Sequence, residues 1–133
     1  MKKFSVFVVL ILVSALATSI YAARQEKHVK ARLEEIGGSG VSGFVQVTQL
    51  PSHHDGSNLH VQITGLEDGT EYASFYYESD DCSAPADFFE GFTANGSRAT
   101  LVGKIDEDLD EVGSVSVRLG PGYGTLLACA TIH

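Results

Sequence analysis

The stretch Leu59-His60-Val61-Gln62-Ile63-Thr64 decides the fold class, because apolar and polar residues alternate along its whole length. Successive side chains of a β-strand point to opposite faces of a sheet, so this alternation predicts a strand with one buried and one solvated face. Turn signals stand on both sides of it, Asp55-Gly56 before and Asp68-Gly69 after. The stretch therefore predicts one strand of an antiparallel sheet.

The same period of two residues recurs along the chain, and the turn signals Asn95-Gly96 and Gly120-Pro121-Gly122 separate the later runs. At least six short strands with no helix between them predict an all-β fold, an antiparallel β-sandwich or barrel. The expected strands contain these positions: Val41, Val45 and Val47; Leu59, Val61 and Ile63; Tyr72–Tyr77; Ala99, Leu101 and Ile105; Val115, Val117 and Leu119; and Leu126–Ile132.

The segment Arg24–Ile36 has a different pattern, which is typical of a helix. Val29, Leu33 and Ile36 fall at positions i, i+4 and i+7, so they share one helical face. The glycine-rich run Gly37–Gly40 then ends the periodic segment. The sequence predicts a short helix here, which is a pro-segment, a loose arm or a helix docked on the domain.

The first 22 residues have the order of a secretory signal peptide. Met1-Lys2-Lys3 is positively charged, Phe4–Ala17 is almost wholly apolar, and Ala22 is a small residue suited to cleavage. The alternative, a membrane anchor, needs about 20 apolar residues, and this run is shorter. The sequence therefore predicts secretion and three parts of the chain: a signal peptide at residues 1–22, a helical arm or linker at 23–39 and a β-domain at 40–133.

The chain is acidic, with 9 Lys and Arg against 17 Asp and Glu in 133 residues and a net charge of −8. Loss of the signal peptide removes Lys2 and Lys3, which leaves 7 basic against 17 acidic residues and a net charge of −10. This balance lacks the electrostatic footprint of a nucleic-acid or anionic-membrane binder. We expect an extracellular protein or surface as the partner, and no membrane span after cleavage.

Secretion has two covalent consequences. An oxidising compartment favours a disulfide between Cys82 and Cys129, the two cysteines of the chain, with two free buried thiols as the alternative. This bridge would close a loop of roughly 48 residues, which the chain-entropy model values at up to about 4 kcal/mol. Asn95-Gly96-Ser97 is an N-glycosylation sequon in a polar turn, so Asn95 is the expected glycan site in a eukaryotic host.

Four short segments stand in this order along the chain: Gly40–Val47, Ile63-Thr64-Gly65-Leu66 with Gly69, Cys82-Ser83-Ala84-Pro85, and Gly124–Ile132. Together they resemble parts of the copper/zinc superoxide dismutases. The resemblance covers Gly40–Ile132, and it implies a Greek-key β-sandwich. It also implies that Cys82 and Cys129 form the disulfide of this family, in agreement with the redox argument. The segments are Gly40–Val47, similar to the family's first strand; Ile63-Thr64-Gly65-Leu66 with Gly69, similar to the approach to its metal-binding strand; Cys82-Ser83-Ala84-Pro85, similar to the start of its disulfide loop; and Gly124–Ile132, similar to its closing strand.

The same resemblance implies that the metal site of the family is lost. Phe75, Tyr77 and Arg118 stand where the family has copper-ligand histidines, the metal-bridging histidine falls near Asp87-Phe88, and the active-site arginine falls on Leu126. Copper that changes oxidation state needs imidazole or sulfur ligands. The five histidines, none of which lies between residues 61 and 132, are His28, His53, His54, His60 and His133. We therefore expect no catalytic residue, no metal ligand and no cofactor at this site.

Aromatic residues gather in the run Tyr72–Tyr77. Phase along a strand puts Phe75 and Tyr77 on one side and Tyr76 on the other. The run offers either a ligand-binding face or packing that fills the volume of a lost metal site, and packing is favoured. A buried Tyr77 needs a partner for its hydroxyl group. The predicted partner is Arg118, because the resemblance places both residues at former copper-ligand positions.

Two polar clusters offer metal ligands. His53-His54-Asp55, with His60 across the hairpin, has groups that bind Cu²⁺ or Zn²⁺, but adjacent residues of a turn point in different directions, so a polar turn is favoured. The acids Asp106-Glu107-Asp108 and Asp110-Glu111 have the oxygen ligands that Ca²⁺ prefers. They lack the glycine and the distal glutamate of the usual calcium loop, so a solvated acidic connection is favoured.

The sequence predicts a secreted, non-catalytic superoxide dismutase-like β-sandwich that serves as an extracellular binding or structural module. The alternative is a superoxide dismutase or an extracellular copper-binding protein that uses ligands outside the family pattern, such as His53 and His54.

Overall fold

The structure is a computed structural model that describes residues 27–51, 55–83 and 85–133. Every strand pair in it is antiparallel, and the only helical element in the described residues is one short 3₁₀ turn. The predicted all-β fold is confirmed. The elements are β1 (His28–Glu35), β2 (Ser42–Gln49), β3 (Ser57–Thr64), β4 (Glu71–Tyr77), β5 (Ala86–Thr93), β6 (Arg98–Ile105), η1 (Leu109–Glu111), β7 (Ser114–Leu119) and β8 (Thr125–Thr131).

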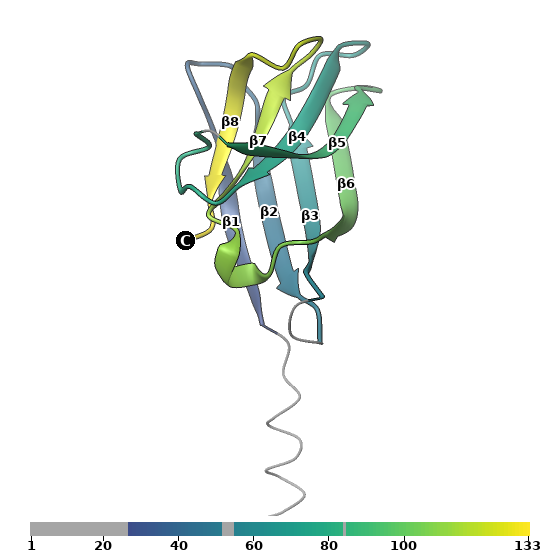
Figure 1. Ribbon diagram of the computed structural model, residues 1–133. Helices are drawn as coiled ribbons and strands as arrows, with labels where there is room; N and C mark the ends of the chain where they lie inside the picture. The colour runs from purple at the N-terminus through teal and green to yellow at the C-terminus, as the bar shows by residue number, and fades with distance from the viewer. Residues whose placement is uncertain (1–26, 52–54, 84) are drawn as a thin grey trace, which may run out of the picture.

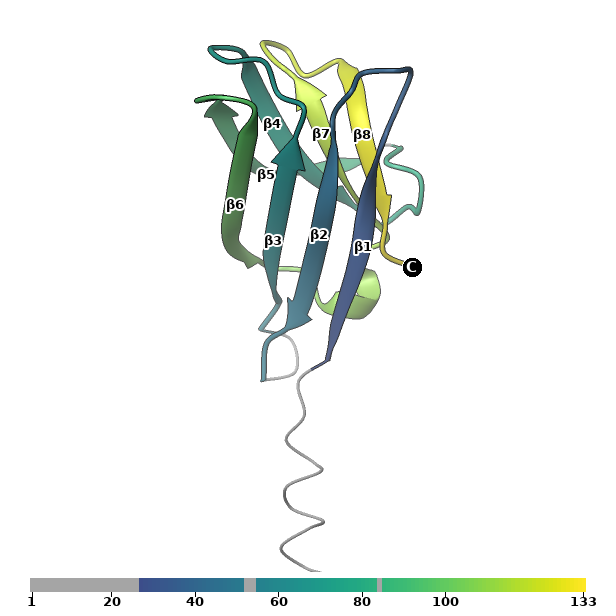
Figure 2. The same ribbon diagram turned by 180° about the vertical axis from the view of Figure 1, so that it is seen from behind.

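The eight strands form one continuous sheet in the order β5-β4-β7-β8-β1-β2-β3-β6, which folds over into two layers. Figure 1 shows β8, β7, β4 and β5 in front, and Figure 2 shows β1, β2, β3 and β6 from the other side. Strand β1 joins the layers, because its residues 28–33 pair with β2 while Glu34 and Glu35 pair with β8. The sandwich therefore has two outer faces, one on each layer.

The core lies between the two layers and follows the predicted alternation. Leu59 and Val61 have no exposed surface and Ile63 is 1% exposed, whereas His60 and Gln62 point outward between them. The other layer contributes Val115 and Val117, which are fully buried. Burial of such side chains is worth roughly 1.5–3 kcal/mol each, so this alternation fixes the register of every central strand. No helix in the described residues has the length and apolarity to cross a membrane.

The helix predicted over Arg24–Ile36 is wrong for the residues that the structure describes, which form strand β1. Val29 and Leu33 are four residues apart, so they share a face in a strand as well as in a helix, and Ala31 lies on the same face. A helix of this length is marginal in water, whereas β1 gains a hydrogen-bonded neighbour on each side. Residues 28–35 thus belong to the sheet and are not a separate arm.

Strand β5 (Ala86–Thr93) was not among the expected strands. It is an edge strand that pairs only with β4, and most of its residues are exposed. Phe88 and Phe89 are adjacent, so the sequence lacks the strict alternation of a strand with one buried face. A bulge between Ser74 and Phe75 of β4 shifts the register of this pair.

Candidate functional site

The outer face of the β4–β7–β8 layer carries a polar network around Tyr77. Ser114, Ser116 and Arg118 alternate with the core residues of β7, so they point away from the core. The Tyr77 hydroxyl lies 2.7 Å from Ser116 Oγ and accepts a hydrogen bond from Arg118 Nε at 2.9 Å. Tyr77 is only 1% exposed. The prediction that a buried Tyr77 pairs with Arg118 is confirmed.

A disulfide loop covers this face. Cys82 is bonded to Cys129 of β8 with a Cα–Cα distance of 6.1 Å, so the predicted disulfide is confirmed. The Cys82 N–H donates to Ser114 Oγ at 2.9 Å, and the same hydroxyl donates to the Ser79 carbonyl at 2.6 Å. Arg118 Nη2 donates to the Cys82 carbonyl at 3.4 Å. The loop is thereby tied to the sheet by one covalent bond and several hydrogen bonds.

The aromatic run of β4 is in packing contacts on both of its sides. Phe75 packs edge-to-face against Phe88 and against Tyr123, each with ring centroids 5.6 Å apart. Tyr72 stacks on Phe92 at 5.7 Å on the core side, where Tyr76 also packs. The predicted division of the run, with Phe75 and Tyr77 on one side and Tyr76 on the other, is confirmed.

The residues at the positions that the resemblance assigns to copper ligands do not fit that metal. A phenyl ring and a guanidinium group have no lone pair for a metal, which excludes Phe75 and Arg118 as ligands. The Tyr77 hydroxyl is already bonded to two protein groups. Leu126, where the family has its active-site arginine, is an apolar residue of β8 that pairs with Arg118.

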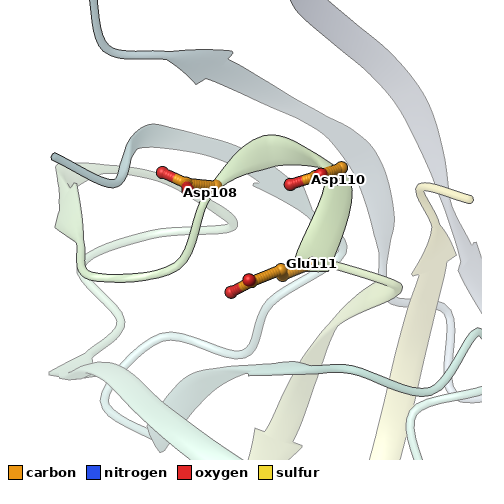
Figure 3. A group of neighbouring side chains, drawn as sticks. All are labelled: Asp108, Asp110 and Glu111. Carbon is orange, nitrogen blue, oxygen red and sulfur yellow. The ribbon is translucent and has the colours of Figure 1, made fainter. Parts of the chain in front are cut away.

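An acidic group surrounds η1. Figure 3 shows Asp108, Asp110 and Glu111, each of which has one carboxylate oxygen within 4.8 Å of those of the other two. Asp108 Oδ1 also accepts hydrogen bonds from Gln49 Nε2 at 3.0 Å and from the Gly56 N–H at 3.3 Å. Ca²⁺ takes about six to eight oxygen ligands, and one of the three carboxylates here already holds two protein donors. The arrangement is better explained as a tie between η1 and the hairpin that joins β2 to β3.

Glu107 is the most perturbed carboxyl group in this connection. A hydrogen bond with Glu111, burial, and repulsion from Glu111, Glu78 and Asp87 raise the pKa of Glu107 from its ordinary value of 4.5 to about 7. The sequence predicts a solvated acidic connection here. The carboxyl groups in it are nevertheless close enough together for Glu107 to keep its proton near neutral pH.

The remaining predicted sites divide between exposed and undescribed positions. Asn95 is exposed in the turn between β5 and β6, where a glycan has room. His53 and His54 lie outside the described residues, while Asp55 is exposed and His60 lies on the outer side of β3. The Nε2 atom of His60 is buried and has no hydrogen-bond partner.

The outer face of the β1–β2–β3–β6 layer, which we call the basic face, was not predicted. Cross-strand pairing places its side chains in rows, and Figure 2 views the four strands from this side. It carries four of the six Lys and Arg residues in the described part of the chain, all exposed, and no carboxylate. The basic face consists of His28, Lys30 and Arg32 of β1; Ser42, Phe44, Gln46 and Thr48 of β2; Asn58, His60, Gln62 and Thr64 of β3; and Arg98, Thr100, Val102 and Lys104 of β6.

Two adjoining hollows lie in the basic face. The larger, of about 250 Å³, has Arg32 of β1 at one side and Arg98 of β6 at the other, with Phe44 and Gln62 between them. The smaller, of about 70 Å³, also borders on Phe44 and Gln62 and reaches Lys30 and His60. Lys30 Nζ stands 5.1 Å from the centre of the Phe44 ring, and that side chain is 48% exposed. These hollows combine cations, an amide and an accessible ring.

Sequence reasoning missed this face for one reason. The outward positions of β2, β3 and β6 were visible in the alternation, but the expected helix removed Lys30 and Arg32 from the sheet. No family model and no curated protein matches the sequence.

Proposed function

We propose that this protein is a secreted, non-catalytic β-sandwich, similar to copper/zinc superoxide dismutase in its Greek-key arrangement, which serves as an extracellular binding module. The network of Tyr77, Ser116 and Arg118 carries the proposal. It fills the place that the resemblance gives to the metal site with groups that bind one another.

The network and the disulfide also stabilise the folded chain, which a bound metal would otherwise do. A buried hydroxyl that keeps its partners avoids a penalty of about 1–3 kcal/mol, and the Cys82–Cys129 bridge restricts the unfolded chain. A disulfide is also what an oxidising compartment favours, which agrees with the predicted signal peptide.

The basic face favours a binding role over a purely structural one. Cationic side chains, an exposed phenyl ring and two hollows occur together on one flat layer of a protein that is otherwise acidic. Convergent polar and aromatic groups around a hollow are typical of ligand sites.

A metal-loading experiment tests the proposal. The purified oxidised protein is incubated with Cu²⁺ and Zn²⁺, excess metal is removed by gel filtration, and bound metal and superoxide decay are then measured. We expect the rate of decay to stay at that of the buffer, because no imidazole stands at the ligand positions.

Stoichiometric copper with rapid superoxide decay would overturn the proposal in favour of a dismutase. Bound copper without decay, lost in His53→Ala/His54→Ala, would instead make the protein an extracellular copper-binding protein.

A further inference from the structure

We propose that the basic face binds an acidic polysaccharide, with a carboxylate-bearing sugar ring in the hollow between Arg32 and Arg98. This inference rests on the proposed function of a binding module, and it names the class of ligand. The occupant is a linear chain of sugar rings rather than a small ion, because the groups that face solvent extend over four strands.

Charge favours an anionic ligand at this position. Lys30, Arg32, Arg98 and Lys104 are exposed, and in the described part of the chain none of them forms an ion pair with a carboxylate. Glu34, two residues after Arg32 on β1, lies beyond the last row of the basic face, where it and Glu35 border a separate hollow with Arg32 and Ser42. An anion can therefore reach the four cations without breaking an ion pair, although the molecule as a whole is negative and these two carboxylates limit the site at the Arg32 end.

The two arginines come from strands that are not neighbours. Strands β2 and β3 lie between β1 and β6, so the backbones that carry Arg32 and Arg98 are about 14 Å apart at a strand spacing of about 4.8 Å. Both side chains nevertheless border the same 250 Å³ hollow. A guanidinium group binds a carboxylate through two parallel hydrogen bonds, so this pair holds one charged ring from two sides.

The rest of the hollow fits a sugar better than a peptide. Phe44 offers an aromatic face for the apolar side of a sugar ring, while Gln62, Ser42 and Thr64 offer groups that hydrogen-bond hydroxyls. A peptide that binds as an added strand needs unpaired backbone N–H and C=O groups. Strands β2 and β3 are hydrogen-bonded to a neighbouring strand on both edges, so they have none to offer. The face thus presents side-chain groups only.

Calorimetric titration with an oligogalacturonate of six units tests the inference. We expect binding that weakens as salt rises, and its loss with the fully methyl-esterified oligomer, which keeps the rings but lacks the charges. Arg32→Gln and Arg98→Gln should each weaken binding by about tenfold or more, because each removes one charge-assisted pair. Phe44→Leu should weaken it by about three- to tenfold.

Lys27→Gln is the matched control, because Lys27 is exposed but precedes β1 and lies outside both the basic face and its hollows. It should change affinity less than about twofold, since an isolated exposed charge contributes little. All four residues are exposed, so circular dichroism should show a native fold in each variant.

Equal losses in Lys27→Gln and Arg98→Gln would overturn the site, and equal binding of the methyl-esterified oligomer would overturn the role of charge. Hexaglutamate binding as tightly as the sugar would assign the face to an acidic peptide instead. Absence of oligogalacturonate binding contradicts this inference alone, whereas the superoxide experiment decides the proposed function independently.

Discussion

Tyr77 illustrates how one side chain organises a face of the sheet. Its ring is buried beneath the disulfide loop, and its hydroxyl joins Ser116 to Arg118. Arg118 continues to the carbonyls of Cys82 and Tyr123, at 3.4 and 3.3 Å, so two loops depend on the same guanidinium group. By holding Arg118, the Tyr77 hydroxyl therefore also positions the two loops that contain Cys82 and Tyr123.

Tyr77→Phe should lower the free energy of unfolding by about 1–2 kcal/mol, because it leaves the buried Ser116 hydroxyl and Arg118 Nε without this partner. Urea unfolding followed by circular dichroism measures the change. Tyr123→Phe is the control: its hydroxyl is 3.5 Å from Glu71 Oε1 in an exposed contact, and the change should stay within about 0.5 kcal/mol. Equal effects of the two variants would contradict the role given to Tyr77.

At the scale of elements, β1 and the connection through η1 hold the sandwich together. Strand β1 pairs with both layers and closes the sheet between β8 and β2. At the end of the sandwich, the Gln49 side chain ties β2 to the start of η1. Its Oε1 accepts a hydrogen bond from the Leu109 N–H at 2.8 Å, and its Nε2 donates to Asp108 Oδ1 at 3.0 Å. In the same connection, a hydrogen bond with Glu111, burial and repulsion from neighbouring carboxylates raise the pKa of Glu107.

The stability of the protein should therefore depend on pH between about 4.5 and 7. In this window the folded protein keeps the Glu107 proton, whereas the unfolded chain releases it. The contribution of Glu107 to the free energy of unfolding is therefore complete below about pH 4.5 and is lost as the pH rises toward 7. Glu107→Gln should be more stable than the native protein at pH 8 and similar to it near pH 4.5. Denaturant titrations at several pH values measure this.

Glu90→Gln, at an exposed position of the edge strand β5, removes the same charge away from this cluster and is the control. If Glu90→Gln abolished the pH dependence as fully as Glu107→Gln, the assignment to Glu107 would be wrong.

At the scale of the whole molecule, charge is separated. Five acids lie in the connection around η1, Asp106, Glu107, Asp108, Asp110 and Glu111, whereas one layer presents a face with four exposed cations and no carboxylate. The overall charge of −8 conceals this arrangement, because a sum does not depend on position. Net charge predicts that nucleic acid and anionic membranes are not partners, but it does not decide on an anionic partner that contacts this face alone.

The disulfide is the covalent link that acts on the whole chain. Cys82 and Cys129 are 47 residues apart, and their bond joins the loop after β4 to β8. The double variant Cys82→Ala/Cys129→Ala should lose up to about 4 kcal/mol of unfolding free energy, because the unfolded chain regains the entropy of an open loop. Guanidinium unfolding of the oxidised protein, the reduced protein and the double variant measures the loss. An unchanged midpoint in the variant would contradict it.

The sequence by itself determined the all-β class, the face of each central strand, the disulfide and the partner of Tyr77. The first three depend on a local pattern or on a chemical requirement that few residues can meet, whereas the choice of Arg118 as the partner of Tyr77 rests on the resemblance, which places both at copper-ligand positions. Alternation states which residues of a strand are buried, and a buried hydroxyl and two cysteines in an oxidising compartment each need a partner.

Only the tertiary structure decided that residues 28–35 form a strand, that β5 exists and that Arg32 and Arg98 border one hollow. Val29 and Leu33 satisfy a helix and a strand equally, so neighbours in space made the choice. A local pattern shows where along the chain a strand lies. The order of the strands in the sheet depends on which strand edges pair, often between residues far apart in sequence, and a local pattern does not contain that information. The basic face is a product of that order, since its hollow is bordered by residues of strands distant in sequence. The raised pKa of Glu107 arises mainly from Glu111, four residues along the chain, with burial and smaller contributions from Glu78 and Asp87.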